Sequence, residues 1–207
     1  MKYLQLIALI TIGIAGCNSS KKEKALPIMG RTEYTLNDTI YHQVKDFSFV
    51  NQDSVIVTGK TFEGKIYVTD FFFTSCPTIC PIMKTQMLRV YENIKDYDDV
   101  AILSHTIDPE YDTVALLKDF SERLGVSAPK WHFVTGDKFK IYEQAQRSYM
   151  VTAAEDKSAP GGAIHSGAFI LVDKEKHIRG FYDGTVAEDV DELMRDIDLL
   201  RKEYAVK

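Results

Sequence analysis

The stretch KIYVTDFFFTSCPTICP, residues 65–81, joins an apolar run to two cysteines. Its first half, residues 65–73, is rich in β-branched and aromatic residues with hardly a polar interruption, which is typical of a strand covered on both faces. Cys76 and Cys80 follow, where the pattern changes from strand to helix. In a helix, residues four apart share one face, with Cβ atoms about 5 to 6 Å apart. Both sulfurs can therefore meet one small soft metal ion or bond to each other.

Alternating strand and helix patterns continue after this stretch. Gly125 is placed to end a helix, and Asp112 and Asp137 precede helical patterns, so we expect these two carboxylates to act as N-caps. Strands are predicted at residues 100–107 and 131–135, and helices at residues 80–94, 112–124 and around 141–149.

Hairpin patterns lie on both sides of this alternating region. Residues 46–57 predict an N-terminal hairpin, and residues 168–182 predict a second one around a polar turn. Residues 152–164 have no period and predict a mobile loop that leads directly to His165. Residues 185–188 have the spacing of a capping box that opens a last helix.

The predicted order of elements is hairpin, strand, cysteine-bearing helix, strand, helix, strand, helix, hairpin and helix. A dithiol between a strand and a helix, followed by a closing hairpin and a C-terminal helix, is typical of a thioredoxin-like α/β fold. The expected architecture is a mixed central sheet with helices on both faces and an N-terminal hairpin. The chain has 207 residues, 45% of them hydrophobic, without an internal repeat, and this fits one domain.

The first residues have the features of a bacterial lipoprotein signal. Lys2 supplies a positive charge, an apolar run follows, and a small-residue cleavage site ends at Cys17. The run is shorter than the ~20 residues that a spanning helix needs, so lipidation of Cys17 is favoured over a retained transmembrane anchor. We therefore expect a signal peptide at residues 1–16, a lipidated tether at residues 17–35 and the folded domain at residues 36–207.

Charge and cysteine content restrict the partners. The formal net charge is −5 at pH 7, and it becomes about −6 when the single charge of Lys2 is removed. An acidic chain without a basic cluster is not expected to bind nucleic acid or anionic lipid headgroups. We therefore expect the protein to reach the membrane only through the lipid attached to Cys17. With Cys17 lipidated, only Cys76 and Cys80 remain for chemistry, in an exported protein where disulfides can form and persist.

Several separated blocks of sequence resemble one family. The C-P-x-x-C-P segment ending at Pro81 is followed by TIDPEYDT at 106–113, WHFVTGD at 131–137 and the pair His165-Ser166. In this order, over about 46–200, they resemble the Sco/SenC copper-handling proteins of the thioredoxin superfamily. Two positions depart from the family pattern: Ile164 stands where the family commonly has an aspartate, and Tyr111 where it commonly has an arginine.

The resemblance implies an exported, lipid-anchored copper chaperone whose domain faces the periplasm or extracytoplasmic space. Copper would be held by Cys76, Cys80 and His165, a donor set that suits it chemically, because thiolate sulfur is soft and imidazole also binds copper. The receiving partner would be the copper centre of a respiratory cytochrome oxidase. Since the dithiol must stay reduced in an oxidising compartment, a thiol-donating redox protein is implied as a second partner.

The residues themselves leave other uses of the two thiols open. Cys76 and Cys80 suit a thiol-disulfide reductase that keeps a partner's cysteines reduced without metal and without His165. Peroxide reduction by Cys76 rests on kinship with the superfamily alone. A purely structural disulfide is disfavoured, because this pair closes almost no loop. The choice between a metallochaperone and a thiol-disulfide oxidoreductase stays open.

Other potential ligands have ordinary structural explanations. Zinc is less suitable than copper, because a structural zinc site normally has four protein ligands and no fourth candidate stands out. Apolar spacing on a helix indicates core packing for methionines, and histidines on strands are expected to have satisfied polar atoms. The expected positions are the core for Met83 and Met87, satisfied core or edge sites for His105 and His132, and the surface for His42 and His177.

Overall fold

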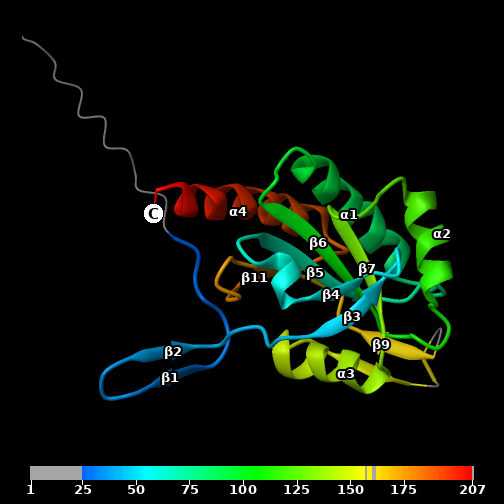
Figure 1. Cartoon of the computed structure of the whole chain (residues 1–207), viewed down its shortest axis with the longest axis horizontal. Helices are drawn as coiled ribbons and strands as arrows, with labels where there is room; N and C mark the ends of the chain where they lie inside the picture. The colour runs from blue at the N-terminus through cyan, green and yellow to red at the C-terminus, as the bar shows by residue number, and fades with distance from the viewer. Residues whose placement is uncertain (1–24, 157, 160–161, 207) are drawn as a thin grey trace, which may run out of the picture.

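The computed structural model describes residues 25–206, apart from 157, 160 and 161. Its centre is a seven-stranded mixed sheet with the order β11-β10-β5-β6-β7-β3-β4 (Figure 1). The central strands β5, β6 and β7 are parallel, and the other pairs are antiparallel. The strands are β3 (Ser48–Asn51), β4 (Ile56–Thr58), β5 (Ile66–Phe72), β6 (Val100–Thr106), β7 (Trp131–Thr135), β10 (Ala168–Val172) and β11 (Ile178–Asp183).

The two central strands confirm the prediction of a strand covered on both faces. Every residue of β5 and β6 is buried, and the pair runs in parallel register with Asp70 opposite Ser104 and Phe71 opposite His105. Because side chains alternate between the two faces of a strand, Asp70 and Phe72 point to one side of the sheet and Phe71 to the other. This alternation decides which residues reach the candidate site.

Helices cover both faces of the sheet, as predicted. Lys84 of α1 and Phe120 of α2 both contact Phe72, and α4 packs beside α1. Tyr149, directly after η2, contacts Phe71 on the opposite face, and Figure 1 shows α3 across the sheet from α1 and α4. The helices are η1 (Gly59–Phe62, 3₁₀), α1 (Cys80–Ile94), α2 (Val114–Leu124), α3 (Lys138–Glu143), the π-turn η2 (Gln144–Ser148) and α4 (Ala187–Ala205).

Two of the predicted caps are wrong. Asp112 does not cap α2, because the Thr113 side chain accepts the hydrogen bond from Leu116 N, and Asp112 is buried elsewhere. No capping box opens α4: its N-cap, Val186, has no side-chain bond, and the Thr185 hydroxyl donates to Asp183 instead. Asp137 does cap α3, with Lys140 N 2.9 Å from its Oδ1.

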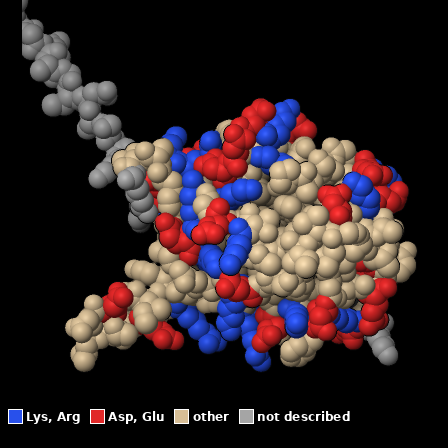
Figure 2. Space-filling model, viewed as in Figure 1, with Lys and Arg blue, Asp and Glu red and all other residues tan. Residues whose placement is uncertain are grey.

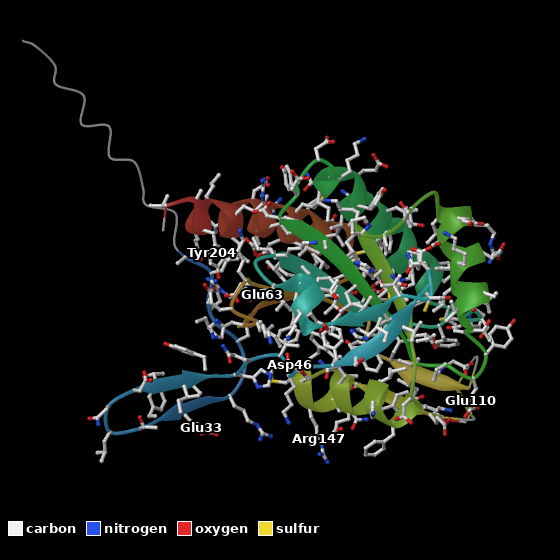
Figure 3. All side chains as sticks on the ribbon, viewed as in Figure 1. Glu33, Asp46, Glu63, Glu110, Arg147 and Tyr204 are labelled. Carbon is white, nitrogen blue, oxygen red and sulfur yellow. The ribbon has the colours of Figure 1, made fainter. Side chains whose placement is uncertain are left out.

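Two short hairpins were not predicted. β1 (Thr32–Tyr34) and β2 (Thr39–Tyr41) form an arm that projects from the body, and Glu33 lies on it (Figures 1 and 3). The space-filling view shows few charges on this arm, and on the body the acidic and basic residues gather in the left part and along the edges, around a broad uncharged region (Figure 2). The predicted mobile loop at 152–164 instead contains a ladder between β8 (Ala153–Glu155) and β9 (Ala163–His165), so that prediction is wrong for these two segments.

The first described residues pack against the C-terminal half of the domain. Leu26 N donates to Glu203 Oε1 at 2.9 Å, and Arg179 donates to the carbonyl oxygens of Leu26 and Pro27. Met29 forms an isolated β-bridge with Ile178. Within 25–206, outside the gaps, no helix has the length and apolar character to cross a bilayer. The expected signal peptide and Cys17 lie outside the described residues.

Candidate metal and dithiol site

The two cysteines lie where β5 gives way to α1. Cys76 N donates to Phe73 O at 3.2 Å, which closes a turn after the strand, and Cys80 is the first residue of α1. Pro81 occupies the first turn of that helix, where a missing N–H costs nothing. Both side chains are buried, with 8% and 4% of their surfaces exposed. The strand-to-helix placement predicted from the sequence is therefore confirmed.

A buried carboxylate fixes the segment in front of Cys76. Asp112 accepts hydrogen bonds from Thr74 N, 3.1 Å from its Oδ2, and from the hydroxyls of Thr74 and Thr106. Because Thr106 ends β6, Asp112 connects the cysteine-bearing turn to the neighbouring central strand. The residue that was expected to cap a helix instead supports the site.

His165 reaches the cysteines from a distant part of the chain. It ends β9, where it pairs with Ala153 of β8, and its ring lies edge-on to Phe73 with centroids 5.8 Å apart. Nδ1 is 3.0 Å from the backbone oxygen of Ser166, and Nε2 is 3.1 Å from Cys80 Sγ. A carbonyl oxygen only accepts, so Nδ1 carries the ring proton and the Nε2 lone pair faces Cys80.

The three donor atoms are close enough to share one metal ion. The ligand atoms of Cys76, Cys80 and His165 all lie within 4.8 Å of one another. Donors bound at about 2.0 to 2.3 Å from one ion lie roughly 3.5 Å apart, so small side-chain rotations suffice. Two thiolates and one imidazole are a soft donor set that suits Cu(I). The hydrogen bond from Nδ1 orients the imidazole, as metal-binding histidines usually require.

The two thiols differ in their readiness to ionise. Burial raises the pKa of Cys76, but the hydrogen bonds from Thr78 and Cys80 outweigh it, so this pKa lies below its ordinary value. Burial raises the pKa of the Cys80 thiol to about 12. Burial also lowers the pKa of His165, against the hydrogen bond to Ser166. The metal-free site therefore holds one activated thiol, one protonated thiol and a neutral imidazole.

The other four histidines lie outside the group of Cys76, Cys80 and His165. Met83 and Met87 are fully buried in the core, as expected. His132 Nδ1 accepts from Asn51 Nδ2 at 3.1 Å, whereas both ring nitrogens of His105 lack a hydrogen-bond partner among the described residues. The expectation of a satisfied histidine is therefore wrong for His105, and it is only half met at His132, whose Nε2 is also unpaired.

The two histidines expected at the surface are partly buried. His42 Nε2 donates to the backbone oxygen of Ser148 at 2.7 Å, and His177 Nδ1 lies 3.5 Å from Asp173 Oδ2. The two departures from the family pattern are exposed side chains: Ile164, directly before His165, is 43% exposed, and Tyr111 is 57% exposed.

Sequence reasoning missed the residues that support the three donors. Thr78 contacts Cys76 Sγ at 3.6 Å through Oγ1, and the backbone of Ser166 orients His165. Lys84 and Asp70 form a buried ion pair on the same side of the sheet. The signal for this pair was present in the sequence, since Asp70 interrupts an apolar strand and Lys84 follows Cys80 by one helical turn.

Comparisons with known proteins find similar solved structures and one matching family. The chain resembles the solved SCO1/SenC family lipoprotein from Bacillus anthracis, at 28% identity and a TM-score of 0.70 over 77% of this chain and 95% of that one. It resembles BsSco, described as a member of the Sco family of cytochrome c oxidase assembly proteins with a disulfide switch, at 30% identity and a TM-score of 0.67 over 77% and 93% of the two chains. It also resembles Arabidopsis thaliana ScoI with copper bound, at 27% identity and a TM-score of 0.63 over 75% and 98%. The SCO1/SenC family model matches residues 37–200, so the chain belongs to the SCO1/SenC family.

Proposed function

We propose that this protein is a copper chaperone that holds Cu(I) through Cys76, Cys80 and His165. The observation that carries the proposal is the convergence of the three donor atoms within 4.8 Å of one another. A related solved structure, that of Arabidopsis ScoI, contains bound copper. Three protein ligands leave copper accessible to an incoming ligand of an acceptor, which suits a protein that delivers its ion.

Copper titration of the reduced protein tests this proposal. We expect the wild-type chain to bind one equivalent of Cu(I), measured by competition with a chromophoric chelator. His165→Ala should weaken Cu(I) binding at least tenfold, and Cys80→Ser should weaken it further, because one of two thiolates is lost. His42→Ala is the matched control, since this histidine bonds to Ser148 outside the site. Binding that is unchanged in both site variants would refute the proposal.

The receiving partner is proposed from the family. BsSco is described as a cytochrome c oxidase assembly protein, and the same destination, the copper centre of a respiratory cytochrome oxidase, is proposed for the copper held here. A thiol-donating protein would keep Cys76 and Cys80 reduced, because only the reduced pair binds copper. This destination is tested by mixing the copper-loaded wild-type protein with the isolated copper-binding subunit of the oxidase. The absorption of the acceptor measures the transfer of copper.

The proposed location is a bacterial cell membrane, anchored through lipid on Cys17, with the domain facing the periplasm or extracytoplasmic space. The support is the lipoprotein signal at the start of the sequence, together with the likeness to a SCO1/SenC family lipoprotein. Mass spectrometry of the N-terminal peptide from the membrane fraction should find a diacylglyceryl group on Cys17. Cys17→Ser should release the protein from that fraction, and a membrane-bound, unmodified Cys17→Ser protein would contradict the anchor.

A thiol-disulfide reductase is the second candidate, and the pKa difference between the two thiols favours it. Cys76 is activated, whereas Cys80 stays protonated until a partner disulfide is attacked. In that case, His165→Ala would leave the turnover of a target disulfide unchanged, whereas Cys76→Ser would abolish it. Turnover no faster than that of free cysteine would eliminate this function.

A further inference from the structure

A buried ion pair lies beside the candidate metal site. Lys84 Nζ is 2.7 Å from Asp70 Oδ2, and the two side chains are only 6% and 0% exposed. Lys84 belongs to α1, one helical turn after Cys80, so both side chains lie on one face of the helix. Lys84 also lines a cavity of about 260 Å³ together with Cys76 and Cys80.

Polar and aromatic groups hold the ammonium in place. Lys84 Nζ donates to Ser104 Oγ at 3.3 Å, and the Ser104 hydroxyl in turn donates to Asp70. The ammonium also lies 4.0 Å from the centroid of the Phe72 ring, a cation–π distance. Trp131 Nε1 donates to Ser104 Oγ at 2.9 Å and completes the network. The positive charge is therefore fixed close to the first turn of α1.

Stability alone does not explain this pair. Taking both charges out of water costs about as much as their attraction returns, and apolar residues of similar volume are often as stable. A fixed cation beside two thiols does have an electrostatic consequence, because charges interact strongly where water is excluded.

Of the two charged residues, only Lys84 lines the cavity that the two cysteines share. Lys84 lines the cavity next to the cysteines, whereas Asp70 lies behind it on β5 and is absent from the cavity wall. A positive charge therefore borders the cavity of the two cysteines, and the carboxylate that balances it stands outside that cavity wall.

We infer that Lys84 is a positioning residue whose buried ammonium stabilises the Cu(I) state of the site over the Cu(II) state. This inference rests on the proposed function. Two thiolates and a neutral imidazole around Cu(I) carry one net negative charge, whereas the same ligands around Cu(II) carry none. The two states differ by one electron alone, so a nearby positive charge favours the reduced state. Asp70 holds the ammonium and moderates its charge.

The reduction potential of the copper-loaded protein tests this inference. Lys84→Met should lower the ratio of Cu(I) affinity to Cu(II) affinity about tenfold, which is about 59 mV in a one-electron potential. Asp70→Asn leaves the ammonium without its counter-charge, so the ratio should rise. The energy of the thiolate-to-Cu(II) absorption band should shift in opposite directions in the two variants. Lys95→Met is the matched control, since Lys95 directly follows the far end of α1 and is half exposed.

The two variants separate an electrostatic role from a structural one. A packing defect would weaken binding of both oxidation states in both variants, without opposite shifts in potential, and would overturn the inference. If Lys84→Met does not fold, the double variant Lys84→Met/Asp70→Asn is compared with Asp70→Asn. These two proteins differ by the same positive charge, so equal reduction potentials in them would also overturn the inference. A wild-type protein that binds no copper refutes the proposed function itself, whereas normal copper binding with unchanged potentials refutes only the role of Lys84.

Discussion

Two thiols one helical turn apart behave differently because their surroundings differ. Cys76 lies in the turn before α1, where the backbone and hydroxyl of Thr78 and the backbone of Cys80 favour its thiolate despite burial. Cys80 faces the interior, and burial raises its pKa to about 12. The thiolate is the reactive form of cysteine, so the two residues should react at different rates in the metal-free protein.

Alkylation of the reduced, metal-free protein measures this difference. At pH 7.5, iodoacetamide should modify Cys76 at least about tenfold faster than Cys80, because Cys76 has the larger thiolate fraction. Peptide mapping by mass spectrometry follows both sites in one reaction. Cys76→Ser should leave only slow modification of Cys80. Equal rates at the two sites in the wild-type protein would contradict the assignment of Cys76 as the activated thiol.

The helix α2 shows how local sequence positions an element beside the site. Thr113 caps its start, and Gly125 ends it in a left-handed conformation with φ 72°, donating its N–H to Glu122 O and Ser121 O. Between these ends, Phe120 and Leu124 form part of the wall of the cavity that Cys76 and Cys80 also line. Proper termination of α2 therefore affects packing next to the dithiol.

Substitution of Gly125 tests the cost of this helix end. Gly125→Ala should lower the free energy of unfolding by about 1 kcal/mol, because a Cβ is disfavoured at positive φ. A Cβ there would meet no atom within 4 Å, so the effect is conformational strain rather than a clash. Gly125→Asn is the matched comparison and should lose less, since asparagine tolerates this conformation. Urea unfolding measures both, and an equal loss in both variants would argue against strain as the cause.

At the scale of the whole molecule, the fold buries His105 in an aromatic cluster on the face of the sheet away from the dithiol. His105 stacks on Phe71 with centroids 4.8 Å apart and meets Phe47, Phe49 and Tyr149 at between 5.5 and 5.8 Å. Among the described residues no group stabilises a charge there, and burial lowers the pKa of His105 from 6.5 to about 3. Burial also lowers the pKa of His132 to about 4. The fold therefore keeps both rings neutral in mild acid.

This burial predicts that the protein loses stability in acid. In the unfolded chain His105 and His132 take up protons near pH 6.5. In the folded protein His132 does so only near pH 4 and His105 only near pH 3. The unfolded state thus binds more protons between pH 6.5 and 4, and stability falls as the pH decreases through this range. Each histidine should contribute about 1.4 kcal/mol per pH unit.

Urea unfolding at pH 7, 5.5 and 4.5 measures this dependence. His105→Phe fits the aromatic cluster and removes one of the buried imidazoles, so the fall in stability between pH 5.5 and 4.5 should be smaller than in the wild-type protein by about 1.4 kcal/mol. An identical pH dependence in His105→Phe and the wild-type protein would exclude His105 as a source of the acid sensitivity.

Most of the secondary structure follows from local pattern. The bounds of α1, the buried strands β5 and β6, and the hairpin of β3 and β4 agree with the expectations, because apolar spacing and turn residues act over only a few positions. The errors at Asp112 and Thr185 have a common reason. Short polar side chains choose among several nearby backbone and side-chain partners, and tertiary contacts made that choice: Thr74 and Thr106 for Asp112, and Asp183 for Thr185.

Three things follow from the sequence alone: the order of elements, the helical spacing of Cys76 and Cys80, and the family resemblance. Each of them depends on residues that are neighbours along the chain. The approach of His165 to Cys80 joins residues 85 positions apart, and the ladder of β8 and β9 that carries it has no periodic signal. The pairing of Lys84 with Asp70 and the solvent-free environment of His105 also depend on strand order and register. These contacts exist only after the sheet has formed, because they are made between segments that the backbone does not connect locally.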